Sequence, residues 1–116
     1  MGYTDAYAPQ EPSRASIEVA RGPLVLEFGA PWCGHCQVAQ DGIAAALGKH
    51  ADIPHVKVGD GRGRPLGRSF RVKLWPTLVF LRDGKERARL VRPRHAHEVA
   101  LALEAILPDA SGSGER

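Results

Sequence analysis

Apolar residues come in short runs separated by turn-forming residues, a pattern that predicts several strands. The run Leu24 to Phe28 is interrupted by one acid, is too short for a helix and is bounded by Pro23 and Gly29, which favours a buried central strand. Asp83-Gly84 is a hairpin signal, so the strand that follows it should be antiparallel. The predicted strands cover residues 24–28, 53–58, 77–81 and 87–91, with a weak edge strand at 4–7.

Between these predicted strands, apolar residues recur at helical spacing, which predicts helices there. Ser13 is the expected N-cap of the first helix, and Pro108 ends the last one. The predicted helices cover residues 14–20, 33 or 34 to 50, 65–70 and 95–107. The result is an α/β fold with a central mixed sheet flanked by helices. We expect one domain at 13–107, an N-terminal extension or weak edge strand at 1–12, and a flexible tail at 108–116.

Length and composition narrow the class of protein. The chain has 116 residues, of which 43% are hydrophobic and 25% charged, as in one ordinary globular domain. It contains no apolar run long enough for a membrane span, and residues 1–12 lack the basic and apolar regions of a signal peptide. A cytoplasmic protein without membrane partners is expected. Two cysteines cannot form a multi-bridge framework, so a close pair is catalytic or metal-binding.

Charge is unevenly distributed along the chain. The formal net charge is +3, but residues 57–94 hold 12 Lys and Arg against 3 acids, while the remainder is net acidic. Such a segment suits nucleic acid, an acidic partner, an anionic small molecule or simply a solvated surface. Few aromatic side chains for base stacking stand there, so nucleic acid is the weaker interpretation.

The sequence Cys33-Gly34-His35-Cys36 lies between a predicted buried strand and a predicted long helix. A helix N-terminus stabilises an anion, which favours the thiolate of Cys33 as a nucleophile. Cys36, one turn later, is placed to resolve a mixed disulfide. A zinc site with His95 and His97 is the alternative, but two histidines two residues apart on a helix project in different directions.

These residues resemble the thioredoxin family. The resemblance rests on Trp32 to Cys36, on the preceding strand Val25 to Phe28, and on Trp75-Pro76-Thr77 before the third strand, and its order and spacing extend over residues 13–107. It implies a thioredoxin-like fold and a thiol-disulfide oxidoreductase that reduces protein disulfides, with no bound cofactor, as a monomer. Electrons would come from a thioredoxin reductase or from glutathione. The alternative is a redox-inert adaptor or chaperone on the same scaffold.

The resemblance also assigns roles around the dithiol. A cis proline facing the cysteines maps onto Pro76, and Trp32, Trp75 and Thr77 are expected to shape the substrate groove. The Gly34-His35 pair is similar to that of protein disulfide isomerase and implies a more oxidising couple than in typical thioredoxins.

A buried acid behind the second cysteine maps onto Glu27, with Lys57 as its neighbour. Glu27 would take the proton from Cys36 during resolution. A plain buried ion pair between Glu27 and Lys57 is the alternative.

Three positions depart from the family pattern. Gly29 replaces a residue that is often aromatic, Gly42 stands near the usual site of a helix-kinking proline, and Arg92 stands where a glycine usually lies beside the dithiol. Arg92, together with Lys73, predicts a basic rim that favours acidic substrates or glutathione conjugates.

Overall fold

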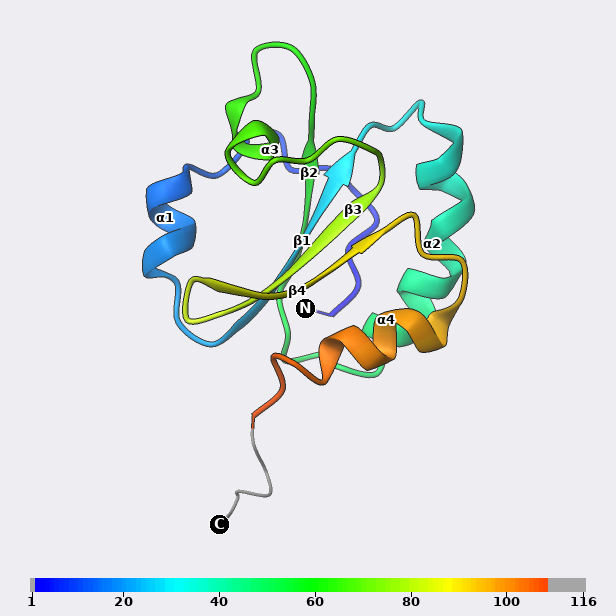
Figure 1. Cartoon of the computed structure of the whole chain (residues 1–116). Coiled ribbons are helices and arrows are strands. Elements are labelled where there is room, and N and C mark those ends of the chain that lie inside the picture. The colour runs from blue at the N-terminus through cyan, green and yellow to red at the C-terminus, as the bar shows by residue number, and fades with distance from the viewer. Residues whose placement is uncertain (1, 109–116) are drawn as a thin grey trace.

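The computed structural model describes residues 2–108 (Figure 1). Helices and strands alternate in the order α1 (Arg14–Val19), β1 (Pro23–Gly29), α2 (Gly34–Leu47), β2 (His55–Gly59), α3 (Pro65–Ser69), β3 (Thr77–Arg82), β4 (Lys85–Val91) and α4 (Ala96–Leu103). The predicted α/β fold is confirmed. Apart from Pro108, the predicted tail 108–116 lies outside the described residues.

The four strands form one mixed sheet in the order β2-β1-β3-β4. β1 is parallel to β2 and antiparallel to β3, and β4 is the antiparallel hairpin partner of β3. A crossover through α2 connects the parallel pair, because parallel strands need a connection that returns the chain to the same end of the sheet. Glu27 of β1 stands opposite Lys57 of β2.

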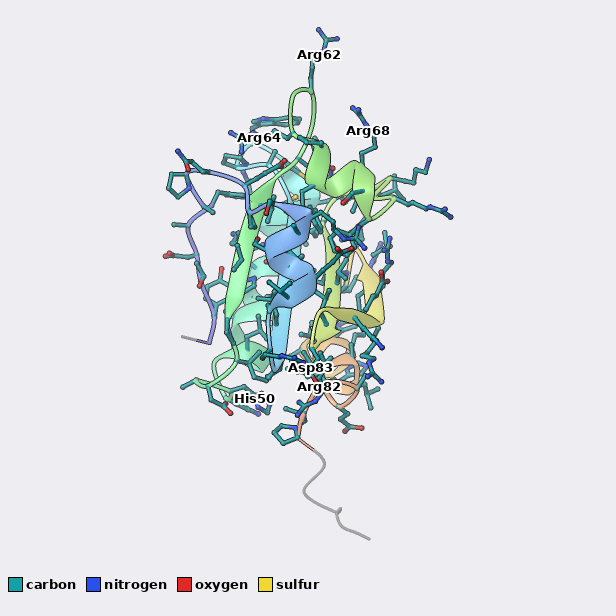
Figure 2. The ribbon with its side chains drawn as sticks, turned by 90° about the vertical axis from the view of Figure 1, so that its left-hand side faces the viewer. His50, Arg62, Arg64, Arg68, Arg82 and Asp83 are labelled. Carbon is teal, nitrogen blue, oxygen red and sulfur yellow. The ribbon has the colours of Figure 1, made fainter. Side chains whose placement is uncertain are left out.

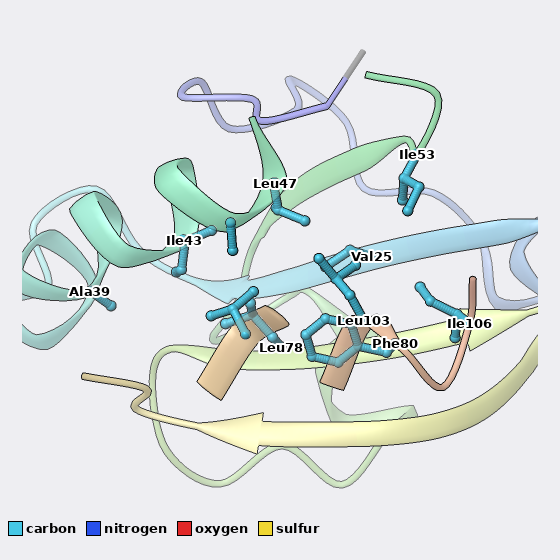
Figure 3. Packing of buried hydrophobic residues seen from close by; sticks show 11 residues of the cluster. Val25, Ala39, Ile43, Leu47, Ile53, Leu78, Phe80, Leu103 and Ile106 are labelled. Atoms are coloured by element: carbon cyan, nitrogen blue, oxygen red, sulfur yellow. The ribbon is translucent and has the colours of Figure 1, made fainter. Parts of the chain in front are cut away.

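Alternation along β1 divides its side chains between two cores. Val25 contributes to a core with α2 and α4, shown in Figure 3, whereas Leu26 and Phe28 pack with residues of α1 and α3 on the other face. Glu27 therefore shares the face of Val25, beneath α2. The first core contains Val25, Ala39, Ile43, Ala46, Leu47, Ile53, Leu78, Phe80, Val99, Leu103 and Ile106.

Both long helices end earlier than the apolar pattern predicts. α2 ends at Leu47 instead of residue 50, and α4 ends at Leu103 instead of residue 107. Beyond Leu103 the chain turns through short-range bonds such as Ile106 N–H to Leu103 C=O, yet Ile106 stays buried in the core. Within residues 2–108, no helix is long and apolar enough to cross a bilayer.

Glycine at position 42 brings α2 against the start of α4. A Cβ atom there would lie 3.1 Å from the backbone nitrogen of Ala96. α2 itself continues through Gly42 as one helix. Gly42 thus serves close helix packing.

The N-terminal segment runs beside β2. Residues 4–7, predicted as a weak edge strand, form a single parallel bridge between Tyr7 and Lys57 rather than a strand. Ala8 N–H donates to the Lys57 carbonyl at 2.8 Å, and Thr4 N–H donates to Nδ1 of His55 at 2.8 Å. This segment therefore covers the part of β2 that lies behind the dithiol.

Candidate active site

The two cysteines stand at the beginning of α2 as free thiols. Cys33 is the N-cap, and its sulfur accepts a hydrogen bond from the Cys36 backbone N–H at 3.2 Å. Cys33 is 7% exposed and Cys36 is 2% exposed. The helix N-terminus thus supplies a donor to the Cys33 sulfur, as the sequence position predicts.

Cys33 opens onto a groove of about 400 Å³. The groove is lined by Trp32, Cys33, Gly34, His35, Lys73, Leu74, Trp75 and Arg92. Trp32 is 75% exposed and meets Trp75 edge to face, with ring centroids 5.5 Å apart. The Trp75 indole N–H donates to Oδ2 of Asp60 at 2.8 Å, which fixes this wall of the groove.

Of the segment from Trp75 to Thr77, which was expected to shape the groove, only Trp75 lines it. The Trp75–Pro76 peptide bond is cis, and Pro76 is buried. Thr77 is 1% exposed, and its hydroxyl donates to the Leu74 carbonyl at 2.6 Å. The Thr77 side chain therefore braces the loop instead of lining the groove.

Arg92 is tied to this same segment. Its backbone N–H donates to the Pro76 carbonyl at 2.9 Å, and its Nε–H donates to the Trp75 carbonyl at 2.8 Å. Its φ of +53° lies in the left-handed region that favours glycine. The side chain lies along the groove and also lines a second hollow with His35.

Behind the dithiol, Glu27 is fully buried, and its carboxylate accepts hydrogen bonds from two side chains. Its Oε1 lies 2.9 Å from His55 Nε2, and its Oε2 accepts from the Gln40 amide at 2.7 Å. Nδ1 of His55 accepts the Thr4 N–H, so the His55 proton is on Nε2 and is donated to Glu27. The acid is thus paired with a neutral histidine.

Lys57 is linked to Glu27 through Gln40. Its Nζ donates to Gln40 Oε1 at 3.0 Å and lies over the Tyr7 ring, 4.7 Å from the centroid. Tyr7, Gln40 and Lys57 border a cavity of about 470 Å³ behind the dithiol. Its lining is Asp5, Ala6, Tyr7, Ala30, Pro31, Cys36, Gln37, Gln40 and Lys57.

The surroundings of Cys36 hold its thiol protonated. Burial raises the pKa of Cys36 from 9.0 to about 12, and the hydrogen bond with Cys33 acts in the same direction. The negative charge of Glu27 adds to this increase. Cys36 must therefore lose a proton before it can attack a mixed disulfide.

The basic segment does not form one patch. Figure 2 shows Arg62, Arg64 and Arg68 at the end of the molecule where α3 lies, with Arg82 at the opposite end. The expectation that His95 and His97 project in different directions was wrong: His95 is the extended N-cap of α4 and not a helical residue, and the two rings stack with their planes 9° apart. Over the described part of the chain, no three His, Cys, Asp or Glu side chains gather as a metal site.

Sequence reasoning missed four polar groups of the site. Gln40 is one turn after Cys36 on the same helix face, and His55 precedes Lys57 by two residues on the same strand face, so periodicity could have found both. Tyr7 and Asp60 carry no local signal, because long-range packing brings Tyr7 beside Cys36 and Asp60 to the Trp75 indole.

Comparisons with known proteins agree with this geometry. The thioredoxin family model matches residues 10–105. Thioredoxin 2 from Pseudomonas aeruginosa, solved in its reduced form, is 46% identical with a TM-score of 0.80, and the match covers 97% of this chain and 100% of that one.

Two curated proteins are also similar. Protein disulfide-isomerase of Zea mays is 34% identical over 101 residues, which cover 80% of this chain and 20% of that protein. Thioredoxin H2 of Arabidopsis thaliana is 34% identical over 68 residues, covering 59% of this chain and 51% of that protein. The chain thus spans about a fifth to a half of the length of these relatives.

Proposed function

Because this chain belongs to the thioredoxin family, we propose that it is a thiol-disulfide oxidoreductase that reduces protein disulfides through Cys33 and Cys36. The observation that carries the proposal is the free Cys33 sulfur at the N-cap of α2, facing a groove and accepting the Cys36 N–H. A nucleophile in this position is stabilised as a thiolate.

The reaction has two displacements. The Cys33 thiolate attacks one sulfur of a substrate disulfide, a Cys33–substrate disulfide forms, and the other substrate sulfur leaves as a thiolate. Cys36 then loses its proton and attacks the Cys33 sulfur. The mixed disulfide breaks, the second substrate thiolate leaves and takes a proton from water, and the Cys33–Cys36 disulfide remains. Two electrons pass from the dithiol to the substrate.

We propose that Glu27 accepts the proton that Cys36 loses during resolution, with Lys57 as its charged neighbour. The Glu27 charge is among the causes that raise the pKa of Cys36, which supports a carboxylate close enough to accept its proton. Lys57, linked through Gln40, offsets the buried negative charge. His35 lies at the groove beside Cys33, where a positive charge on its ring would favour the thiolate and raise the reduction potential.

The groove supports an extended peptide chain as the substrate. Trp32 and Trp75 offer apolar walls, and Arg92 and Lys73 add positive charge. We therefore propose a preference for disulfides flanked by acidic residues, or for glutathione conjugates.

The electron donor and compartment follow from the same chemistry. A dithiol reductase needs a reducing partner, either a thioredoxin reductase or glutathione, and a reducing compartment such as the cytoplasm. A monomer is sufficient, because all the groups named belong to one chain. Recycling assays with each donor alone distinguish the two partners.

Insulin reduction tests the activity. The wild type should precipitate the insulin B chain in the presence of dithiothreitol, Cys33→Ser should be inactive, and Cys36→Ser should accumulate mixed disulfides on Cys33. A wild type with no activity above dithiothreitol alone would favour the redox-inert adaptor.

A further inference from the structure

The open position at Gly29 lies between the Cys36 thiol and the Tyr7 hydroxyl. A Cβ atom at residue 29 would stand 2.6 Å from Cys36 Sγ and 3.1 Å from Tyr7 Oη. The first distance is too short for any side chain, so glycine leaves this space to the phenol. The Tyr7 hydroxyl and the Cys36 sulfur therefore flank the same open position, and both residues border the cavity behind the dithiol.

Tyr7 is held in this place from two sides. The parallel bridge to Lys57 and the bond from Ala8 N–H fix its backbone against β2. The Lys57 ammonium over the ring fixes its side chain. Tyr7 and Cys36 both border the cavity behind the dithiol, whereas the substrate groove is bordered by neither of them. The phenol therefore lies on the Cys36 side of the dithiol and does not obstruct the substrate groove.

The environment keeps the phenol protonated. Burial raises the pKa of Tyr7 well above 10.0, and negative charge on the neighbouring Cys36 and Glu27 raises it further. When Cys36 loses its proton, Tyr7 still carries one. A phenol in this state donates to a thiolate instead of competing with it for a proton.

We propose that Tyr7 is a catalytic residue of the resolution step, whose hydroxyl donates a hydrogen bond to the Cys36 sulfur as this becomes a thiolate. This role rests on the proposed dithiol activity. The Cys36 proton passes to the Glu27 carboxylate, the Cys36–Cys33 bond forms, and the substrate sulfur leaves with the electron pair. The Tyr7 O–H bond stays intact and stabilises the negative charge while it is on Cys36.

The test separates the two displacements with the disulfide of thionitrobenzoate in stopped flow. Attack by Cys33 releases the first coloured thiolate and resolution by Cys36 releases the second. In Tyr7→Phe, the first phase should be unchanged. The second should slow about tenfold at pH 7, with the midpoint of its pH profile about one unit higher. Tyr3→Phe is the matched control, because it removes a hydroxyl of the same segment that binds Gln40 instead of a cysteine.

Three outcomes overturn the role of Tyr7. In the first, the second phase of Tyr7→Phe has the wild-type pH profile. In the second, both phases slow together with a lower Tm, which is the mark of a structural residue. In the third, Tyr3→Phe shifts the profile equally. A wild type that releases only one equivalent, or none, would instead refute the dithiol function.

Discussion

Cys33 and Cys36 begin the same helix, yet they border different cavities. Cys33 lines a groove open to solvent, with aromatic walls and positive charge. Cys36 borders the cavity behind, together with Gln40 and Lys57, and Gln40 links Lys57 to the buried Glu27. One helical turn thus separates substrate recognition from proton handling. Changes on either side should therefore affect one displacement and spare the other.

The largest effect is expected from the rear network, in His55→Leu. This change removes the Nε2 donor from the fully buried Glu27 carboxylate and leaves Gln40 alone to bind it. The free energy of unfolding should fall by about 3 kcal/mol, because a buried charge loses a partner. Urea denaturation measures the loss, while the rate of Cys33 alkylation should stay near that of the wild type.

Two further variants test whether the stability loss in His55→Leu comes from the unpaired charge on Glu27. Arg89→Leu breaks an exposed bidentate pair with Glu86 and should cost less than about 1 kcal/mol. The double variant Glu27→Leu with His55→Leu removes the charge with its partner and should recover most of the stability. Equal losses in His55→Leu and Arg89→Leu would show that the rear pair contributes nothing special.

An effect of intermediate size is expected in the dependence of the free energy of unfolding on pH. Because the pKa of Cys36 is about 12 when folded and 9.0 as its ordinary value, the unfolded chain loses this proton first as pH rises. The stability contribution is complete below pH 9 and is lost as pH rises toward 12, with a slope of up to about 1.4 kcal/mol per pH unit. Between pH 7 and pH 10, the free energy of unfolding should fall more in reduced wild type than in Cys36→Ala, and the excess should follow this slope. Urea denaturation of both proteins at the two pH values measures it. A difference that does not change with pH contradicts the buried thiol.

The smallest effect belongs to the groove, in Arg92→Gly. Loss of a cation at the rim should reduce the preference for an acidic over a basic disulfide peptide a few-fold, since an exposed contact is worth at most about 1 kcal/mol. High salt should reduce the wild-type preference similarly. Stability should change little, because glycine suits the positive φ at residue 92 and offsets the loss of the exposed bond from Arg92 to the Trp75 carbonyl. If the ratio of peptide rates is the same in both proteins, Arg92 does not select substrates.

Elements with strong local patterns could be predicted from the sequence. The run from Leu24 to Phe28, the Asp83-Gly84 turn and the apolar stripe of α4 fix the strands, the hairpin and the last helix. The end of α4 could not be predicted, because Ile106 remains buried after the helix has ended and the apolar period continues. Periodicity detects burial, and here burial extends beyond the helix.

In the site too, residues with a local sequence pattern could be predicted, and residues brought in by long-range packing could not. Cys33 and Cys36 could be placed from their position between a strand and a helix, and Trp75 and Arg92 were placed at the groove by resemblance. The expected contact between Glu27 and Lys57 is replaced by a link through Gln40, with His55 as the partner of the acid. Tyr7 could not be found, because its segment is polar and rich in turns, and only the absence of a side chain at Gly29 admits it.

The edge-to-face pair of Trp32 and Trp75 has a spectroscopic consequence. The sequence contains two tryptophans, and both line the groove beside Cys33. All indole emission of the protein therefore originates within a few side chains of the reacting sulfur. Oxidation of the dithiol and arrival of a peptide should each change the intrinsic fluorescence with no contribution from indoles elsewhere. The chain thus carries its own optical reporter, and redox titrations can be followed without a label.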